Sequence, residues 1–131
     1  MAGTVTVTHY EIGNIRQIVA SCVADAADGS IPATVLPAFE GTIRSLATNP
    51  GATAPTANYD ITLLDQHGHD VLQSLGLNRH TSTTEKVPIV YSGTSIHPVV
   101  DEADVLTLTF ANNSVNSAIT VVTLTYSLGA G

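Results

Sequence analysis

The chain has 131 residues, of which 44% are hydrophobic and only 11% are charged, and its formal net charge is −7. This length indicates one domain, 1–131, with a single core, and the composition lacks the high charge and low hydrophobicity of a disordered chain. Four cationic residues against 11 acidic ones are poorly suited to a nucleic-acid backbone or an anionic bilayer, so we expect neither nucleic acid nor membrane as a partner. Cys22 is the single cysteine, which excludes an intrachain disulfide, and we expect a buried, inert thiol.

Threonine alternates with apolar residues in three stretches, at 4–8, 106–110 and 122–126. Successive side chains of a β-strand point to opposite faces, so each run places apolar groups on one face and hydroxyls on the other. Two of the runs lie near the two ends of the chain. We therefore predict that the first and last strands belong to the core sheets.

Strand patterns recur along the chain and are separated by turn residues. In chain order, we predict strands at 3–12, 14–24, 40–48, 57–65, 86–92, 96–100, 104–111 and 118–128. Gly13-Asn14 forms a tight turn, and Asn112-Asn113-Ser114 is predicted to close a hairpin between the last two strands. Short strands at this spacing indicate an all-β fold, an antiparallel β-sandwich or jelly roll.

One segment has a different pattern. Residues 70–76 are predicted to form one short helix, with Asp70 as its N-cap and Gly76 just beyond its end. The polar, aperiodic residues that follow, 77–85, predict a long exposed loop of the kind that carries partner contacts.

The turn at 65–70 brings two histidines and two aspartates close together in sequence, as Asp65, His67, His69 and Asp70. These are metal-binding residue types, but Gly68 between the histidines is typical of a turn that splays its side chains outward. We therefore expect a structural turn and no metal. The sequence also lacks the Gly-x-Ser-x-Gly nucleophile motif and a glycine-rich phosphate loop, so we expect a protein without catalytic activity or cofactor.

Two loops, 25–38 and 77–85, are candidates for contacts with a partner. The segment 25–38 and its border contain apolar residues among turn residues, which need burial in the chain's own core or against a neighbour. The residues predicted as contacts are Ile31, Val35, Leu36, Phe39, Arg79 and His80. The alternative, equally supported by the same pattern, is that 25–38 folds back as an irregular strand over the chain's own core.

Several motifs together resemble small structural proteins of tailed bacteriophages. The stretch 41–65 combines an Asn-Pro-Gly loop and an Ala-Pro-Thr step with the strand Tyr59-Asp60-Ile61-Thr62. Residues 65–72 are similar to the Asp-x-x-Gly-x-Asp-Val-Leu turn of that family. The opening Gly3-Thr4-Val5-Thr6-Val7-Thr8, followed by Ile12-Gly13-Asn14-Ile15, also resembles theirs.

This resemblance implies a non-enzymatic virion component, and we favour a capsid decoration (cement) protein that stabilises the exterior of the head. It implies the major capsid protein as partner, a homo-oligomer, most commonly a trimer, and a location in the virion after synthesis in the host cytoplasm. Three alternatives stay open: a tail or adaptor component, a carbohydrate-binding β-sandwich for host attachment, and a small metal-dependent enzyme centred on His67 and His69.

Overall fold

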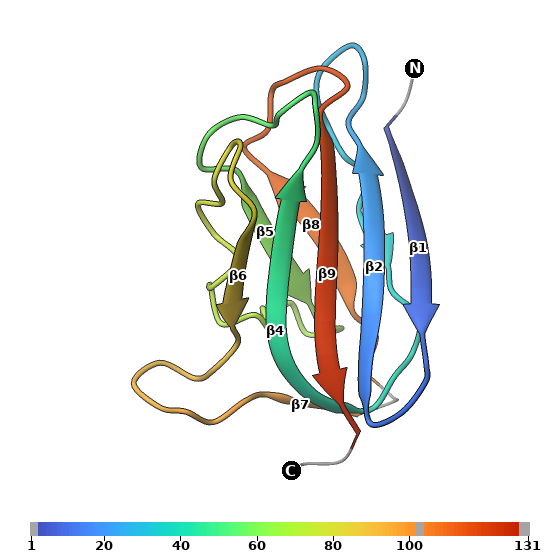
Figure 1. The fold of residues 1–131 in the computed structure, drawn as a ribbon, viewed down its shortest axis with the longest axis vertical. Coiled ribbons are helices and arrows are strands. Elements are labelled where there is room, and N and C mark those ends of the chain that lie inside the picture. Colours follow the sequence, from blue (N-terminus) through green and yellow to red (C-terminus); the bar gives the residue numbers. More distant parts are fainter. Residues whose placement is uncertain (1–2, 102–103, 129–131) are drawn as a thin grey trace.

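The structure is a computed structural model that describes residues 3–101 and 104–128. Its strands are β1 (Thr4–Tyr10), β2 (Ile15–Val23), β3 (Thr34–Val35), β4 (Gly41–Pro50), β5 (Asp60–Leu64), β6 (Glu85–Pro88), β7 (Val99–Val100), β8 (Thr107–Ala111) and β9 (Ile119–Ser127). The predicted all-β sandwich is confirmed, because two antiparallel sheets pack against each other (Figure 1). All eight predicted strands are present, and β3, inside the segment 25–38, is the strand that the sequence pattern did not predict.

The larger sheet has the strand order β1-β2-β9-β4-β6, with β7 also paired to β4, and the smaller sheet has the order β3-β8-β5. The last strand, β9, therefore lies in the middle of the larger sheet, and the first strand, β1, lies at its edge (Figure 1). Both ends of the chain thus contribute strands to the larger sheet, as predicted. The predicted alternation of threonine and apolar residues is also present in β9, where Val122, Leu124 and Tyr126 are buried in the core while the threonines between them face outward.

A β-bulge in β4 explains why its apolar residues do not alternate. The register with β9 shifts between Ile43, which lies opposite Tyr126, and Ser45, which lies opposite Thr125, so Arg44 is the extra residue of the bulge. The extra residue lets both Ile43 and Leu46 face the core, three positions apart. Arg44 Nε instead donates to Ser127 Oγ at 2.9 Å, and this bond holds the bulge against β9.

The predicted hairpin between β8 and β9 is wrong, because the two strands belong to different sheets. The connecting segment is held by Asn113, whose Oδ1 accepts the Thr56 N–H at 2.9 Å and whose Nδ2 donates to Gly29 O at 2.7 Å. These bonds join three loops at one end of the sandwich. Turn residues in the sequence signalled a reversal but carried no information about which sheet the next strand would join.

The predicted helix at 70–76 is also wrong, since these residues form consecutive turns. Gln73 and Ser74 have positive φ angles of 55° and 62°, which break a right-handed helix. Asp70 does act as a cap: its carboxylate accepts the N–H groups of Leu72 and Ser74, each at 3.0 Å, and that of Leu63 at 3.1 Å. The Asp70 side chain thus stabilises the turns and links them to β5 through Leu63.

Candidate functional site

Segment 25–38 follows the alternative in which it folds back over the chain's own core. Ile31, Leu36 and Phe39 are 9%, 7% and 5% exposed and belong to the hydrophobic core. Phe39 packs on Tyr126 with ring centroids 4.3 Å apart. Of the four apolar residues predicted as partner contacts here, Val35 alone, at 61% exposure, presents its side chain to the surroundings.

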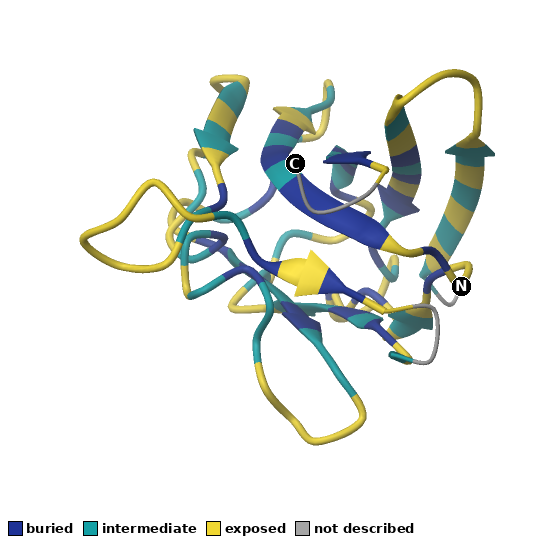
Figure 2. Cartoon of the chain, turned by 90° about the horizontal axis from the view of Figure 1, so that it is seen from below, coloured by how far each residue is buried: buried dark blue, intermediate teal, exposed yellow. Residues whose placement is uncertain are grey.

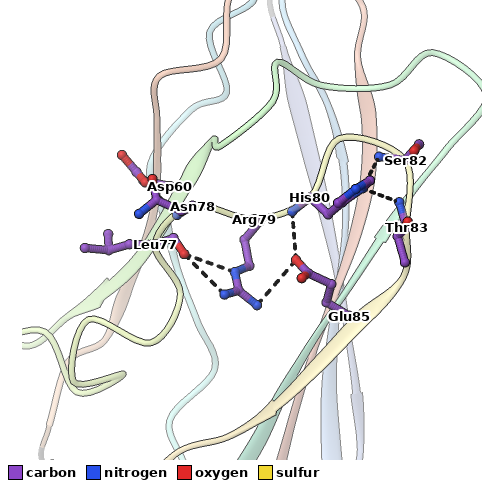
Figure 3. A network of polar contacts seen from close by, with 8 residues as sticks. All are labelled: Asp60, Leu77, Asn78, Arg79, His80, Ser82, Thr83 and Glu85. Atoms are coloured by element: carbon purple, nitrogen blue, oxygen red, sulfur yellow. Dashed lines mark hydrogen bonds and ion pairs between the residues drawn. The ribbon is translucent and has the colours of Figure 1, made fainter.

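Arg79 and His80, the other two predicted contacts, organise the loop that carries them (Figure 3). Arg79 forms an ion pair with Glu85 at 3.6 Å and donates to Leu77 O from Nε and Nη2. The Glu85 carboxylate also accepts the His80 N–H at 2.7 Å. The Arg79 side chain is only 12% exposed, so its first role is structural.

The His80 ring closes the next turn. Its Nδ1 accepts the backbone N–H groups of Ser82 and Thr83, at 3.1 and 2.9 Å, so the neutral imidazole with an unprotonated Nδ1 fits this geometry (Figure 3). The His80 residue is exposed, and a contact between it and a partner stays a prediction.

The turn at 65–70 has the structural character that the sequence predicts. Asp65 Oδ1 accepts the N–H groups of His67 and His69 at 2.8 and 3.0 Å, and both histidines are exposed. The bond from the His69 backbone is the main cause that lowers the pKa of Asp65. The carboxylate is thus used by the turn, and within the described residues no cluster of three His, Cys, Asp or Glu side chains has the arrangement of a metal site.

A polar cleft of about 220 Å³ lies where β1, β2 and β9 meet, at the end where β1 finishes. Its lining includes His9, Glu11, Arg16, Phe39, Glu40 and Tyr126. His9 Nε2 lies 2.5 Å from the Tyr126 hydroxyl, the Glu11 carboxylate lies 3.5 Å from His9 Nδ1, and Glu11 forms an ion pair with Arg16 at 3.6 Å. Burial raises the pKa of Tyr126, so the hydroxyl stays protonated and fixes the position of the ring at the floor of the cleft.

Beside this cleft, exposed apolar side chains gather at one end of the larger sheet, which we call the apolar end. Its members, with their exposed fractions, are Tyr10 (55%), Ile12 (90%), Ile15 (60%), Val99 (61%) and Leu128 (38%). The pairing places them along one row across the end of the sheet: Ile15 lies opposite Ser127, Ser127 opposite Thr42, and Thr42 opposite Val99, so the strands β9 and β4 lie between Ile15 and Val99. Figure 2 looks onto this end and shows the exposed β1–β2 turn and the exposed start of β7.

The apolar end has the composition of a small docking surface. Its exposed members are aliphatic and aromatic, and the charged residues Glu11, Arg16 and Glu40 line the neighbouring cleft. An apolar centre with a polar rim is the usual anatomy of a protein interface.

The sequence analysis did not select the apolar end, although two signals pointed to it. Ile15 is out of phase with the core positions Ile18 and Ala20, so the strand periodicity places it on the outer face. Ile12 directly precedes the Gly13-Asn14 turn, where Gly13 has φ of 79°, and an apolar side chain at a hairpin turn has no core to enter. Val99 and Leu128 carried no such signal, because their position depends on strand pairing.

Comparisons with known proteins give no relative. No family model matches the chain, and no curated protein or solved structure matches it either. Along the described part of the chain there is no helix with the length and hydropathy needed to cross a bilayer.

Proposed function

We propose that this protein is a non-enzymatic structural protein of a bacteriophage virion, a capsid decoration (cement) protein that docks on the major capsid protein through its apolar end. The observation that supports the proposal is the presence of five exposed apolar residues at one end of the sandwich. Such surfaces on soluble domains mark interaction sites, because their burial is favourable at roughly 25 cal/mol per Å².

The chemistry of the surface favours a protein partner. A net charge of −7 opposes binding to nucleic acid or to anionic lipid, whereas an apolar centre with a polar rim suits a protein shell. The resemblance of the motifs at 41–65 and 65–72 to tailed-phage proteins is the reason for proposing a phage head as the protein shell. They also imply a homo-oligomer, a trimer in the usual case, located in the virion.

Two other functions can be distinguished from capsid decoration by experiment. A tail or adaptor component would occupy another part of the particle, which a map of labelled virions locates. A carbohydrate-binding protein would use exposed aromatic rings, here Tyr10 and Tyr91, and would bind glycans in the absence of any shell.

The experiment is co-sedimentation with purified heads that lack this protein. Wild-type chain is expected to bind saturably, and the double variant Ile12→Ser/Ile15→Ser to bind at least about tenfold more weakly, because two anchors of the surface lose their apolar area. Ile96→Ser is the matched control, since Ile96 is also 61% exposed but lies on another loop. Thermal unfolding of all three proteins should agree within a few degrees.

Two results contradict the proposal. Wild-type protein that fails to bind heads removes the decoration function. Equal binding by wild type and the double variant keeps the function but moves the docking surface away from the apolar end.

A further inference from the structure

β1 is an open edge of the larger sheet. It runs over seven residues, Thr4–Tyr10, and among the residues that the structure describes it is paired on one side only, with β2. The strand contains no Lys, Arg, Asp, Glu or Pro, the residues that natural proteins place on edge strands to prevent pairing with other chains. Figure 1 shows β1 as the outermost strand beside β2.

The pairing pattern identifies the backbone groups that face outward. Directly beyond the two ends of β2, the Ala24 N–H donates to Ala118 O and Asn14 O accepts the Leu128 N–H, so even-numbered residues of this strand turn their backbone toward β9. Backbone direction alternates in an antiparallel ladder, and odd-numbered residues of β2 therefore face β1. Their partners are Thr4, Thr6, Thr8 and Tyr10. It follows that the N–H and C=O groups of Val5, Val7 and His9 point away from β2.

The other sheet edges carry features that block such pairing. β6 has Lys86 and Pro88 within its four residues. β5 is covered by 70–79, since Leu63 O accepts the Val71 N–H at 2.9 Å and Gly76 O accepts the Ile61 N–H at 2.9 Å. β3 is two residues long. Against this background, a long and uncharged edge at β1 indicates a partner strand.

We propose that the partner is β1 of a second copy of this chain, paired antiparallel about a two-fold axis at Val7. This register places Val7 opposite Val7 of the second copy and Val5 opposite its His9. All three outward-facing residues of each strand are then satisfied, by about six backbone hydrogen bonds in total. On the outer face, Thr6 lies opposite Thr8 of the second copy and continues the threonine alternation across the junction.

A second copy fits this edge for two reasons. The edge is matched to itself, because each outward-facing residue meets an outward-facing residue in the same register. It is also uncharged, so two copies with a net charge of −7 each meet here without like charges directly opposite. The inference does not depend on the proposed function. It predicts a dimer in solution, in contrast to the trimer that the phage-like motifs imply.

Charge substitution on the outer face tests the pairing and its register. Thr6→Glu/Thr8→Glu and Thr6→Lys/Thr8→Lys each place like charges opposite one another across the axis, and each variant alone is expected to sediment with the mass of one chain. Mixed together, the two variants place Glu opposite Lys at both positions and should recover the mass of two chains. Ser82→Glu/Thr83→Glu, which adds the same charge on an exposed loop, should keep the wild-type mass.

Hydrogen exchange gives a second test that uses wild-type protein only. The amides of Val5, Val7 and His9 should become protected as the concentration rises, while those of Thr6 and Thr8, already bonded to β2, should be protected throughout. A wild type that remains a single chain without this protection overturns the proposal. So does a trimer whose mass is unaffected by both charged pairs, or a mixture of the two variants that fails to associate. Binding to heads by the monomeric variants separates this result from the proposed function.

Discussion

At the scale of residues, single polar side chains stabilise the turns by accepting backbone N–H groups. Asp70, Asp65 and His80 each accept two or more backbone N–H groups of their own turns. Asn113 cross-links three loops. A carboxylate or imidazole that satisfies several backbone donors is occupied structurally, which is why these polar residues make poor candidates for metal or catalytic chemistry.

Cys22 provides the prediction at this scale. The side chain is fully buried, and burial raises the pKa of the thiol from 9.0 to about 12. The native state therefore holds the thiol proton more tightly than the unfolded chain. Its contribution to stability is complete below pH 9 and is lost as the pH rises toward 12.

We expect thiol reagents at pH 8 to modify native protein at least about a thousandfold more slowly than protein in denaturant, because reaction requires unfolding. Between pH 9 and 12 the free energy of unfolding should fall more steeply for wild type than for Cys22→Ala. Fast modification of native protein would contradict the burial of this side chain.

At the scale of elements, the phase of apolar residues decides which surface a segment presents. Segment 25–38 presents Ile31 and Leu36 to the core and Val35 to the surroundings, and its two-residue strand β3 fixes this phase against β8. Full burial of one such aliphatic side chain stabilises the fold by about 1.5–3 kcal/mol. The buried residues of this segment therefore stabilise the chain's own fold, and only its exposed side chains are free to contact a partner.

This difference within one short segment can be measured. Ile31→Ser and Leu36→Ser should each lower the free energy of unfolding by about 2–4 kcal/mol, since each leaves a cavity and buries a hydroxyl. Val35→Ser, the matched control, should change it by less than about 0.5 kcal/mol. The measurement is urea unfolding of the isolated protein, and equal stability of all three variants would show that the segment lies outside the core.

At the scale of the whole molecule, β9 holds the larger sheet together. It pairs with β2 on one side over Ile119–Ser127 and with β4 on the other. Its buried residues Thr120, Val122, Leu124 and Tyr126 cross the centre of the sandwich. β9 follows β1, β2, β4, β6 and β7 in sequence and joins β2 to β4, so the larger sheet is complete only when β9 is in place.

Deletion of residues 119–131 is therefore expected to prevent folding. Without β9, β2 and β4 lose their shared neighbour, and the core loses the buried side chains of Val122, Leu124 and Tyr126. Far-ultraviolet circular dichroism and a thermal melt of the truncated chain test this, with full-length protein as control. A cooperative unfolding transition in the truncated chain would refute the central role of β9.

The sequence by itself determined the all-β class, eight strands in nearly their observed positions, the turn at Gly13-Asn14, the burial of Cys22 and the turn at 65–70. These follow from period-two alternation and from turn chemistry, which are local and act within a few residues. The same local rules signalled Ile15 as an outward-facing residue.

Only the tertiary structure decided which strands share a sheet, and with it the hairpin, the helix and the candidate site. β8 and β9 are adjacent in sequence and yet lie in different sheets, and 70–76 bends into turns because Leu72 enters the core while Asp70 is bonded to β5. The apolar end joins residues from the beginning and the end of the chain. Pairing between distant strands is set by the fit of whole faces in one core, and no short stretch of sequence contains that information.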